Sequence, residues 1–504
     1  MTRNHTKKTL SIISAAAVSV FMYYFLPEGN EGQHINAMGA VASLMAILWI
    51  TEALPLAVTS LFPVVLFPIF GIDSGDKTAE SYINSTIFLY LGGFMIALAM
   101  ERWNLHRRIA LSIISVVGSK PSGLILGFML ATAFLSMWMS NTATAVMMLP
   151  IGLSIISKQE ELTGGDNTKA FALPLLLGIA YSASIGGTAT LIGTPPNISF
   201  TRILSIIFPE APEVNFGNWF LLAFPIAVIL LTFTWFMLTR ILFKVGRSAT
   251  IGKSQIKEEL HKLGRAAFEE KAVGIVFLAT AILWMTRADL NLGFFILPGW
   301  SGIFPKSAFF NDGTVAIFTA LLLFIIPARN NGERILGGDV FRKVPWDIIL
   351  LFGGGFALAK GFVISGLSTH IGSQLSGIGG LHPLLITFVI AVAISMLTEL
   401  TSNTATTEMV LPILAAFSVA AGINPLLLMI TGTLSASMAF MLPAATPPNS
   451  VIFGSGRVTI PEMAKAGAFL NLFASLLITI FVYFLGIIIF DIDLSTLPGW
   501  ALPK

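Results

Sequence analysis

Apolar runs separated by short polar segments follow one another along almost the whole chain of 504 residues. Runs close to the length of a bilayer crossing predict a multi-pass membrane protein built from helices. The expected spans lie at residues 9–26, 37–54, 56–71, 84–101, 121–157, 168–208, 217–244, 272–287, 313–327, 345–366, 381–420, 424–455 and 464–491. The runs at 121–157 and 381–420 each look like two helices joined as a hairpin. The fold class is therefore all-α, with eleven full spans if each hairpin returns to the side from which it starts.

The charges of the connecting segments orient these spans. The longest polar segment, 246–271, is rich in Lys and Arg, and the positive-inside rule places it in the cytoplasm. Counting spans from there also places the basic N-terminus, Arg102 and Arg457 inside. The segments expected outside, "PEGNEGQ", "DSGDKTAE" and "FPEAPEVNFGN", hold a single Lys. The N-terminus is thus expected inside and the C-terminus outside, although charge alone does not decide whether the hairpins are re-entrant or cross fully.

The composition supports a membrane protein and removes several other classes. Hydrophobic residues make up 55% of the chain and charged residues 11%, whereas a soluble domain carries about a quarter charged residues. The chain has no Cys, which excludes disulfides, thiolate metal sites and Cys nucleophiles. The net charge of +3 is small, and the basic residues lie in loops, so they indicate topology and not nucleic-acid binding. HExxH, GxSxG and Walker motifs are absent, and an enzyme is not predicted.

The N-terminal sequence "MTRNHTKKTLSIISAAAVSVFMYYFLPEG" has a basic start and an apolar run. It allows either a cleaved signal peptide or a retained first helix. The run from Leu10 to Leu26 is long for a signal peptide and has no clean cleavage site after it, which favours a retained helix.

Two stretches of the chain repeat each other. "SNTATAVMMLP" begins at Ser140 and "SNTATTEMVLP" begins at Ser402, 262 positions later. At the same offset "LGGFMIALAMERWNL" aligns with "GGGFALAKGFVISGL", and each polar stretch is followed by a Thr-Pro-Pro-Asn sequence. Each half thus reads as a Gly-rich helix, a hairpin with a polar tip and a long helix broken at Thr-Pro-Pro-Asn. The charge pattern opens the hairpins from opposite sides, and inverted repeats with broken helices are typical of secondary transporters.

These features divide the chain into four parts. They are an N-terminal segment with the first helix (1–36), a first repeat (37–245) with hairpin 121–157 and broken helix 168–208, a cytoplasmic basic loop (246–271), and a second repeat (272–504) with hairpin 381–420 and broken helix 424–455. A duplicated membrane protein can be purely architectural. That alternative does not explain why the closest identity falls on polar and helix-breaking residues.

The repeated residues suit binding of an anion and a cation together. Ser, Asn and Thr side chains donate hydrogen bonds to carboxylates and offer oxygens to a hard cation. A helix that starts at a hairpin tip adds free N–H groups and the positive end of its dipole. The double prolines free backbone carbonyls at Gly193 and Ala445, and such breaks are tolerated at membrane depth only inside protein or beside a water-filled cavity. A single such motif is usually a packing contact or a kink, but two matched pairs favour a binding site.

Charged residues inside the spans receive no site role. Lys360, Glu399 and Glu408 are the most internal, and each is either a member of a structural pair or a functional group. No buried Arg is expected near the repeated motifs to bind an anion. A doubly charged substrate would therefore need bound cations to supply much of the opposite charge.

Taken together, the paired Ser-Asn-Thr motifs, the two Thr-Pro-Pro-Asn breaks, "WITEALPLAVTSLFPVVLFPIFGI" and "GSGRVTIPEMAKAG" resemble the divalent anion/sodium symporter family. The resemblance covers about residues 37–491. It implies eleven transmembrane helices plus two re-entrant hairpins, a homodimer in a bacterial inner membrane and an elevator-type transport mechanism. It also implies a C4-dicarboxylate such as succinate, or a related di- or tricarboxylate, as the substrate, co-transported with sodium.

The resemblance assigns roles residue by residue. The first sodium site would use Ser136, Ser140, Asn141 and the carbonyl of Gly193, and the second Thr398, Thr401, Asn403 and the carbonyl of Ala445. The substrate would contact Ser140, Asn141, Thr142, Thr194, Ser402, Asn403, Thr404 and Thr446. Thr401 stands where the family is expected to contribute a backbone carbonyl, so its side chain has no clear role. A sodium-independent anion exchanger, and less so a channel, remain alternatives, and the sequence does not select one carboxylate.

Overall fold

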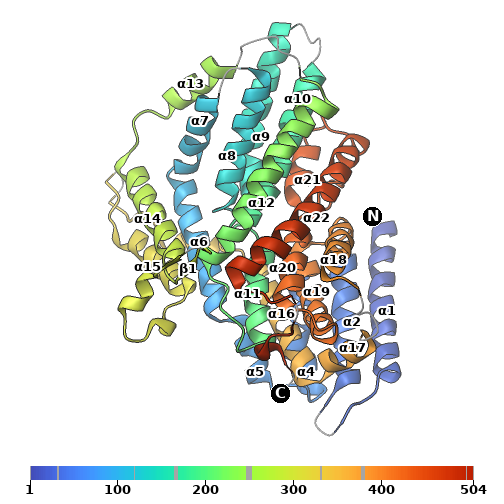
Figure 1. Cartoon of the computed structure of the whole chain (residues 1–504). Coiled ribbons are helices and arrows are strands. Elements are labelled where there is room, and N and C mark those ends of the chain that lie inside the picture. The colour runs from blue at the N-terminus through green and yellow to red at the C-terminus, as the bar shows by residue number, and fades with distance from the viewer. Residues whose placement is uncertain are drawn as a thin grey trace.

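The computed structural model describes residues 2–30, 33–117, 120–163, 168–245, 252–293, 295–329, 332–375, 381–494 and 496–502, and helices dominate it (Figure 1). The first half contains α1 (Thr2–Phe25), α2 (Ile35–Thr51), α3 (Leu56–Thr59), α4 (Phe62–Ile69), α5 (Gly75–Ala79), α6 (Ser85–Arg102), α7 (Leu105–Val117), α8 (Pro121–Ser136), α9 (Asn141–Thr163), α10 (Thr168–Thr188), α11 (Pro195–Ile207) and α12 (Phe216–Phe236). The second half contains α13 (Gly252–Lys262), α14 (Phe268–Met285), α15 (Asp312–Ile325), α16 (Trp346–Ile364), α17 (Leu367–Leu375), α18 (Pro383–Thr398), α19 (Asn403–Ala420), α20 (Pro425–Ala436), α21 (Pro447–Phe453) and α22 (Ile460–Phe490).

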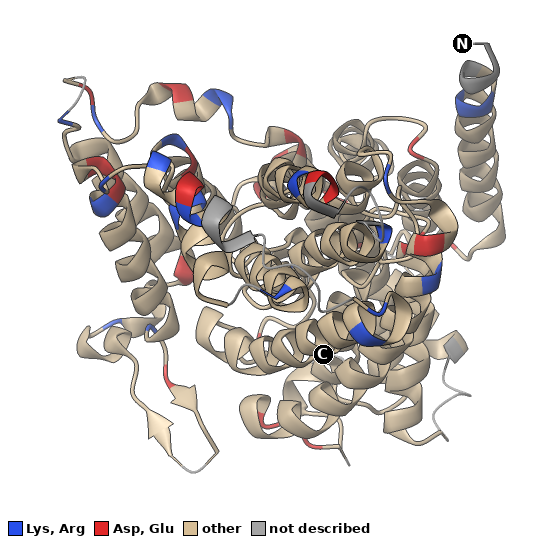
Figure 2. Cartoon of the chain, turned by 90° about the horizontal axis from the view of Figure 1, so that it is seen from above, with Lys and Arg blue, Asp and Glu red and all other residues tan. Residues whose placement is uncertain are grey.

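Several of these helices have the length and polarity of membrane spans. Within the described residues, six helical segments are long and apolar enough to cross a bilayer: Thr6–Phe25, Gly75–Arg102, Lys169–Thr188, Phe216–Leu242, Trp346–Ile364 and Ile460–Phe490. Shorter apolar helices occupy most of the other expected spans. Most of the ribbon carries no charge, and the charged residues that are visible lie mainly at helix ends and in connecting segments (Figure 2).

The internal repeat is visible in the helix bounds. α8 and α18 both start and end 262 positions apart, and α9 and α19 start 262 positions apart. After the hairpins the offset falls to 252, because α11 starts at Pro195 and α21 at Pro447. The sequence repeat therefore corresponds to a structural repeat, in which each helical hairpin is followed by a helix with a break.

Four described α-helices were not predicted, the shortest being α5 in the segment expected outside. α7 and α17 occupy matching places in the two repeats, directly before the hairpins, and α13 lies in the segment expected to be a loop. α7 is amphipathic: His106, Ala110, Leu111 and Ile114 are buried at helical spacing, while its arginines point elsewhere and form ion pairs. A search for long apolar runs misses such a helix, whereas a search for helical periodicity finds it.

Other parts of the chain also differ from the expectation. The span expected at 56–71 is divided into α3 and α4, and Pro63 in the first turn of α4 accounts for the break, because it cannot donate a backbone hydrogen bond to the preceding turn. The described chain is not purely helical either. Leu290–Asn291 and Ile296–Leu297 form a short antiparallel hairpin, and Pro327 forms an isolated bridge with Arg334. These strands lie in the connection between α14 and α15, away from the polar motifs.

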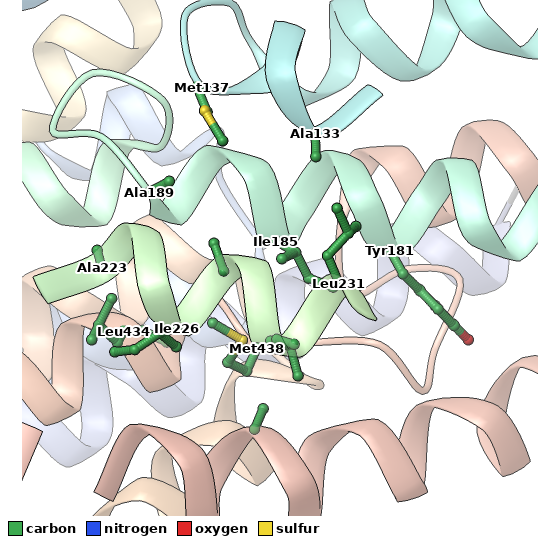
Figure 3. Packing of buried hydrophobic residues seen from close by; sticks show 14 of the residues in the cluster. Ala133, Met137, Tyr181, Ile185, Ala189, Ala223, Ile226, Leu231, Leu434 and Met438 are labelled. Carbon is green, nitrogen blue, oxygen red and sulfur yellow. The ribbon is translucent and has the colours of Figure 1, made fainter. Parts of the chain in front are cut away.

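Small residues allow the helices that carry the polar motifs to approach closely. α10 packs between α8 and α12, and α20 and α22 lie beyond α12 (Figure 3). A Cβ at Gly186 of α10 would collide with the backbone of Ala133 of α8. Within a membrane, helix association depends on such close packing, because lipid is as apolar as the side chains. The close packing of α8 against α10 fixes the position of the first hairpin tip beside the first break.

Candidate substrate and cation site

Four helix starts converge on one cavity. α9 begins at Asn141 and α19 at Asn403, directly after the two hairpin turns, and α11 and α21 begin directly after the two breaks. The cavity has a volume of about 650 Å³. Its walls include all eight residues assigned to the substrate: Ser140, Asn141, Thr142, Thr194, Ser402, Asn403, Thr404 and Thr446. Residues from opposite halves of the sequence, 262 or 252 positions apart, therefore share one cavity.

The hydroxyl groups of this cavity are largely free to bind a ligand. Ser402 and Thr194 are the N-cap residues of α19 and α11, yet neither side chain caps its helix. Ser140, Thr142 and Thr404 make no side-chain hydrogen bond to any described protein group. Thr446 differs, because its Oγ1 accepts a hydrogen bond from the backbone N–H of Asn449, 3.3 Å away. Uncapped N–H groups and free hydroxyls facing a cavity favour an anion there.

The first hairpin tip lies in a cluster of oxygen atoms. Ser136 Oγ lies 2.5 Å from Asn141 Oδ1 and 2.6 Å from the carbonyl oxygen of Ala183. With the Asn141 amide turned over, its NH₂ donates to the carbonyls of Gly193 (3.2 Å) and Ala183 (3.1 Å) instead. Hydrogen bonding alone favours the turned amide, whereas a bound cation favours the orientation with Oδ1 facing these oxygens. Four oxygens from uncharged groups are suitable ligands for a hard monovalent cation.

The second hairpin tip repeats this arrangement. Thr398 Oγ1 lies 2.8 Å from both Asn403 Oδ1 and the carbonyl oxygen of Ala436, and either can accept its hydrogen. Ser136 and Thr398 are both fully buried, and each is the last residue of the helix before the turn. Ala445, whose carbonyl was assigned to the second sodium site, lines the same cavity. Each half of the site thus places a hydroxyl, an amide and backbone carbonyls at the base of a hairpin tip.

The side chain of Thr401 points away from this cluster. Its Oγ1 donates to the carbonyl of Leu397 at 3.0 Å and lies 2.5 Å from Thr406 Oγ1. Both partners belong to the hairpin itself. The backbone carbonyl of Thr401 is therefore the better candidate for a ligand than its hydroxyl.

The asparagines of the two Thr-Pro-Pro-Asn sequences hold the breaks in place. Asn197 Nδ2 donates to the carbonyls of Gly187 and Thr190, at 3.4 and 2.7 Å. Asn449 Nδ2 donates to the carbonyls of Ala439 and Leu442, at 3.2 and 3.1 Å. Ala439 and Leu442 are the residues that align with Gly187 and Thr190 at the offset of 252. These buried amides replace hydrogen bonds that the helices lose at the break.

Sequence reasoning missed some residues around the cavity. Glu52 and Asp347 line it and are exposed, at the C-terminal end of α2 and the N-terminal end of α16, so they mark the side on which it opens. Trp138 also lines the cavity, next to the first tip, and stacks on Phe216 with a centroid distance of 5.9 Å. Glu52 lies inside the recognised stretch 49–72, and Trp138 lies two residues before the first Ser-Asn-Thr motif. Asp347 belongs to a different part of the repeat, and only the fold places it here.

The described residues that line the cavity carry no fixed positive charge. Neither Lys nor Arg is among the described residues that line it, and two carboxylates lie at its opening. Among the described residues, no group of three or more His, Asp or Glu gathers that could hold a metal ion. Attraction for an anion must therefore come from the helix N-termini, the hydroxyl groups and any cation bound in the two oxygen clusters.

Comparisons with known sequences match this chain to sodium-dependent transporters. The family model described as the sodium:sulfate symporter transmembrane region matches residues 5–492. A sodium-dependent dicarboxylate transporter, SdcS, from Staphylococcus saprophyticus is 43% identical over 478 residues, which cover 94% of this chain and 90% of that protein. SdcS from Staphylococcus aureus strain MRSA252 is 44% identical over 481 residues, with the same coverage.

Two solved structures share the fold. MtrF of Neisseria gonorrhoeae, described as representing a class of antimetabolite efflux pumps, superposes with a TM-score of 0.57 at 15% identity and covers 96% of both chains. The YdaH transporter of Alcanivorax borkumensis superposes with a TM-score of 0.55 at 13% identity, covering 80% of this chain and 86% of its own. At such low identity these structures support a shared helical membrane fold and nothing finer.

Proposed function

The chain belongs to the sodium:sulfate symporter family, and on that premise we propose that it transports C4-dicarboxylates such as succinate together with sodium. The resemblance drawn from the Ser-Asn-Thr and Thr-Pro-Pro-Asn motifs is thereby confirmed at the level of the family. The observation that carries the proposal is the cavity in which both hairpin tips and both breaks meet. SdcS, the relative at 43–44% identity, is named as a sodium-dependent dicarboxylate transporter.

The two halves of the cavity suit the two ends of a dicarboxylate. One carboxylate is bound by Ser140, Asn141 and Thr142 at the start of α9, with Thr194 beside them. The other is bound by Ser402, Asn403 and Thr404 at the start of α19, with Thr446 beside them. Hydroxyl and amide donors at a helix N-terminus favour carboxylate binding.

Sodium ions provide the positive charge that the described lining of the cavity lacks. The first is bound by Ser136, Ser140, Asn141 and the carbonyl of Gly193. The second is bound by Thr398, Asn403, the carbonyl of Ala445 and Thr401, the last through its carbonyl. Each ion shares an asparagine with the substrate, so binding of sodium and binding of the dianion favour each other. Sodium is a co-transported substrate in this scheme and not a resident cofactor.

The membrane arrangement follows the same proposal. Eleven helices span the bilayer, the hairpins α8–α9 and α18–α19 are re-entrant, and the protein is a homodimer in a bacterial inner membrane with its N-terminus in the cytoplasm. The side on which the cavity opens, marked by Glu52 and Asp347, is then cytoplasmic. Transport is of the elevator type, in which the hairpins and broken helices move as one region against a scaffold that includes α16.

The test is uptake of radiolabelled succinate into proteoliposomes containing the purified protein, with and without an inward sodium gradient. The expected result is accumulation that requires sodium and is competed by unlabelled dicarboxylates. A panel with malate, fumarate, citrate, tartrate and sulfate identifies the preferred anion. Exchange of internal for external dicarboxylate without any sodium would show an anion exchanger instead, and a non-saturating current would show a channel.

A further inference from the structure

A carboxyl group lies fully buried just behind the cavity wall. Glu408 is one helical turn beyond Thr404 on α19 and has no exposed surface. Its Oε1 accepts a hydrogen bond from Ser199 Oγ on α11. Its other oxygen, Oε2, lies against Gly355 on α16, where an added Cβ would collide with it. No described group donates to Oε2. Glu408 therefore joins three helices, and in the proposed mechanism two of these, α11 and α19, move against the third.

No charged group in the described part of the chain pairs with the carboxyl group of Glu408. α19 itself carries no other titratable residue, and neither do α2, α18 or α20, which pack against it. Of the other helices packed on α19, α11 carries Arg202, α16 carries Asp347 and Lys360, and α17 carries His370. In the described part of the chain, none of these four forms an ion pair or hydrogen bond with Glu408. Among the described residues, the hydroxyl of Ser199 is the one hydrogen-bond partner of the Glu408 carboxyl group.

The helix contact on the α16 side leaves little room for water. Gly355 is buried, and a Cβ added there would collide with Oε2 and with the carboxyl carbon of Glu408. A buried ionised carboxylate with one hydroxyl donor and no cation is far more costly than a buried neutral acid. The packed arrangement of α11, α16 and α19 therefore requires the neutral form.

We propose that Glu408 is a proton-binding site and that transport requires its protonated form, because only the neutral side chain can lie between α19 and α16 as the two helices move past each other. The proton comes from water when movement exposes the carboxylate, and it returns to water when the group is exposed again. The role of this proton in transport rests on the proposed function. Protonation of Glu408 in the arrangement described here is independent of it.

Infrared spectroscopy tests protonation directly. The spectrum of the purified wild-type protein should contain the C=O stretch of a buried carboxylic acid near neutral pH, and this band should be absent from Glu408→Gln. Asp76→Asn, which removes an exposed carboxylate on α5, is the matched control and should leave the band unchanged. A wild-type spectrum that lacks any band lost in Glu408→Gln overturns the proposal.

Uptake measured against pH tests the link to transport. Sodium-driven succinate uptake by the wild type should fall with rising pH, by up to about tenfold per pH unit above the titration midpoint. Uptake by Glu408→Gln, which stays neutral, should be maintained at high pH. Both proteins receive the same mixture of succinate species, so a difference in slope belongs to Glu408. Parallel profiles, or an inserted Glu408→Gln protein that is inactive at every pH, overturn the link.

The two proposals fail separately in these experiments. Absence of sodium-driven uptake by the wild type with any carboxylate contradicts the proposed function, and the infrared result still decides whether Glu408 is protonated. Uptake with parallel pH profiles contradicts the role of Glu408 alone.

Discussion

The two halves of the site keep the same oxygen clusters but support them differently. In the second half, the carboxyl group of Glu399 accepts hydrogen bonds from the backbone N–H groups of Phe440, Met441 and Leu442, at 2.7, 2.8 and 3.0 Å. In the first half, the aligned residue is Met137, which has no such acceptor. There the hydroxyl of Thr190 donates to the backbone carbonyl of Met137 at 2.5 Å.

The difference between Glu399 and Met137 accompanies a difference in where the helices before the two breaks end. The N–H groups bound by Glu399 lie just beyond α20, which ends at Ala436. α10 instead continues to Thr188, and the residue that aligns with Thr188 at the offset of 252 is Phe440, which lies outside α20. The connection 437–446 is correspondingly longer than 189–194. The two halves thus keep the same cluster of oxygen atoms. In the first half the longer helix α10 satisfies the backbone before the break, and in the second half the buried carboxyl group of Glu399 does so.

The tip asparagines are predicted to be the most sensitive positions in both halves. Asn141→Ala and Asn403→Ala should each abolish sodium-dependent uptake, because in the proposed function each asparagine binds both a sodium ion and the substrate. Size-exclusion chromatography should show that both variants still insert and form the wild-type oligomer. Wild-type transport in either variant would remove that asparagine from the site.

Glu399→Gln should damage the second half alone. Gln offers one acceptor oxygen in place of two and carries no charge, so the three N–H groups and Asn471, whose Nδ2 donates to Glu399 at 2.7 Å, lose part of their hydrogen bonding. We expect a loss of stability on the order of 3 kcal/mol, measured as a lower melting temperature, and weaker sodium activation. Met137→Gln at the aligned position is the control. Equal effects of the two substitutions would contradict the asymmetry.

Gly187→Ala should weaken the first half by crowding it. An added Cβ at Gly187 would lie against the amide of Asn141 and 3.0 Å from the carbonyl oxygen of Gly193. Overpacking of this kind costs about 1–3 kcal/mol, so the sodium concentration for half-maximal uptake should rise about tenfold. The aligned residue in the second half is Ala439, and Ala439→Gly should have little effect. An unchanged sodium dependence in Gly187→Ala would show that the first oxygen cluster is not a sodium site.

The smallest effect is expected at Thr401. Thr401→Ala removes a hydroxyl that bonds within its own hairpin and leaves the backbone carbonyl in place, so sodium activation should change by less than about threefold. Thr398→Ala removes a hydroxyl from the oxygen cluster and should cause a clearly larger change. Sodium-activation curves compare the two variants. A larger change in Thr401→Ala than in Thr398→Ala would show that the Thr401 hydroxyl belongs to the second sodium site.

The sequence was sufficient to predict those cavity residues that belong to short, recognisable motifs. Paired Ser-Asn-Thr tips and Thr-Pro-Pro-Asn breaks are recognisable because the same polar and proline-containing sequences occur twice, at matching places inside apolar runs. The residues assigned from them to the substrate all line one cavity. The sodium assignments themselves stay predictions, although Ser136, Asn141, Thr398 and Asn403 form the oxygen clusters on which they depend.

The sequence was not sufficient where a role depends on a distant partner. Lys360, Glu399 and Glu408 looked alike as charges inside spans. In the structure Lys360 pairs with Asp73 at 2.7 Å, Glu399 supports a broken helix and Glu408 lies between three helices. Nothing in the neighbouring sequence distinguishes these environments, because each is created by elements far away in the chain. The amphipathic α7 was missed for a simpler reason, since its pattern was helical but not continuously apolar.

The central claim is that each half of the site binds sodium with the dicarboxylate. The most direct measurement is the initial rate of succinate uptake into proteoliposomes as a function of external sodium concentration. We expect no uptake without sodium and a sigmoidal rise, because the proposed function binds one sodium ion in each half of the site. Uptake that is independent of sodium, or a hyperbolic rise that is unchanged in Asn141→Ala and Asn403→Ala, would contradict it.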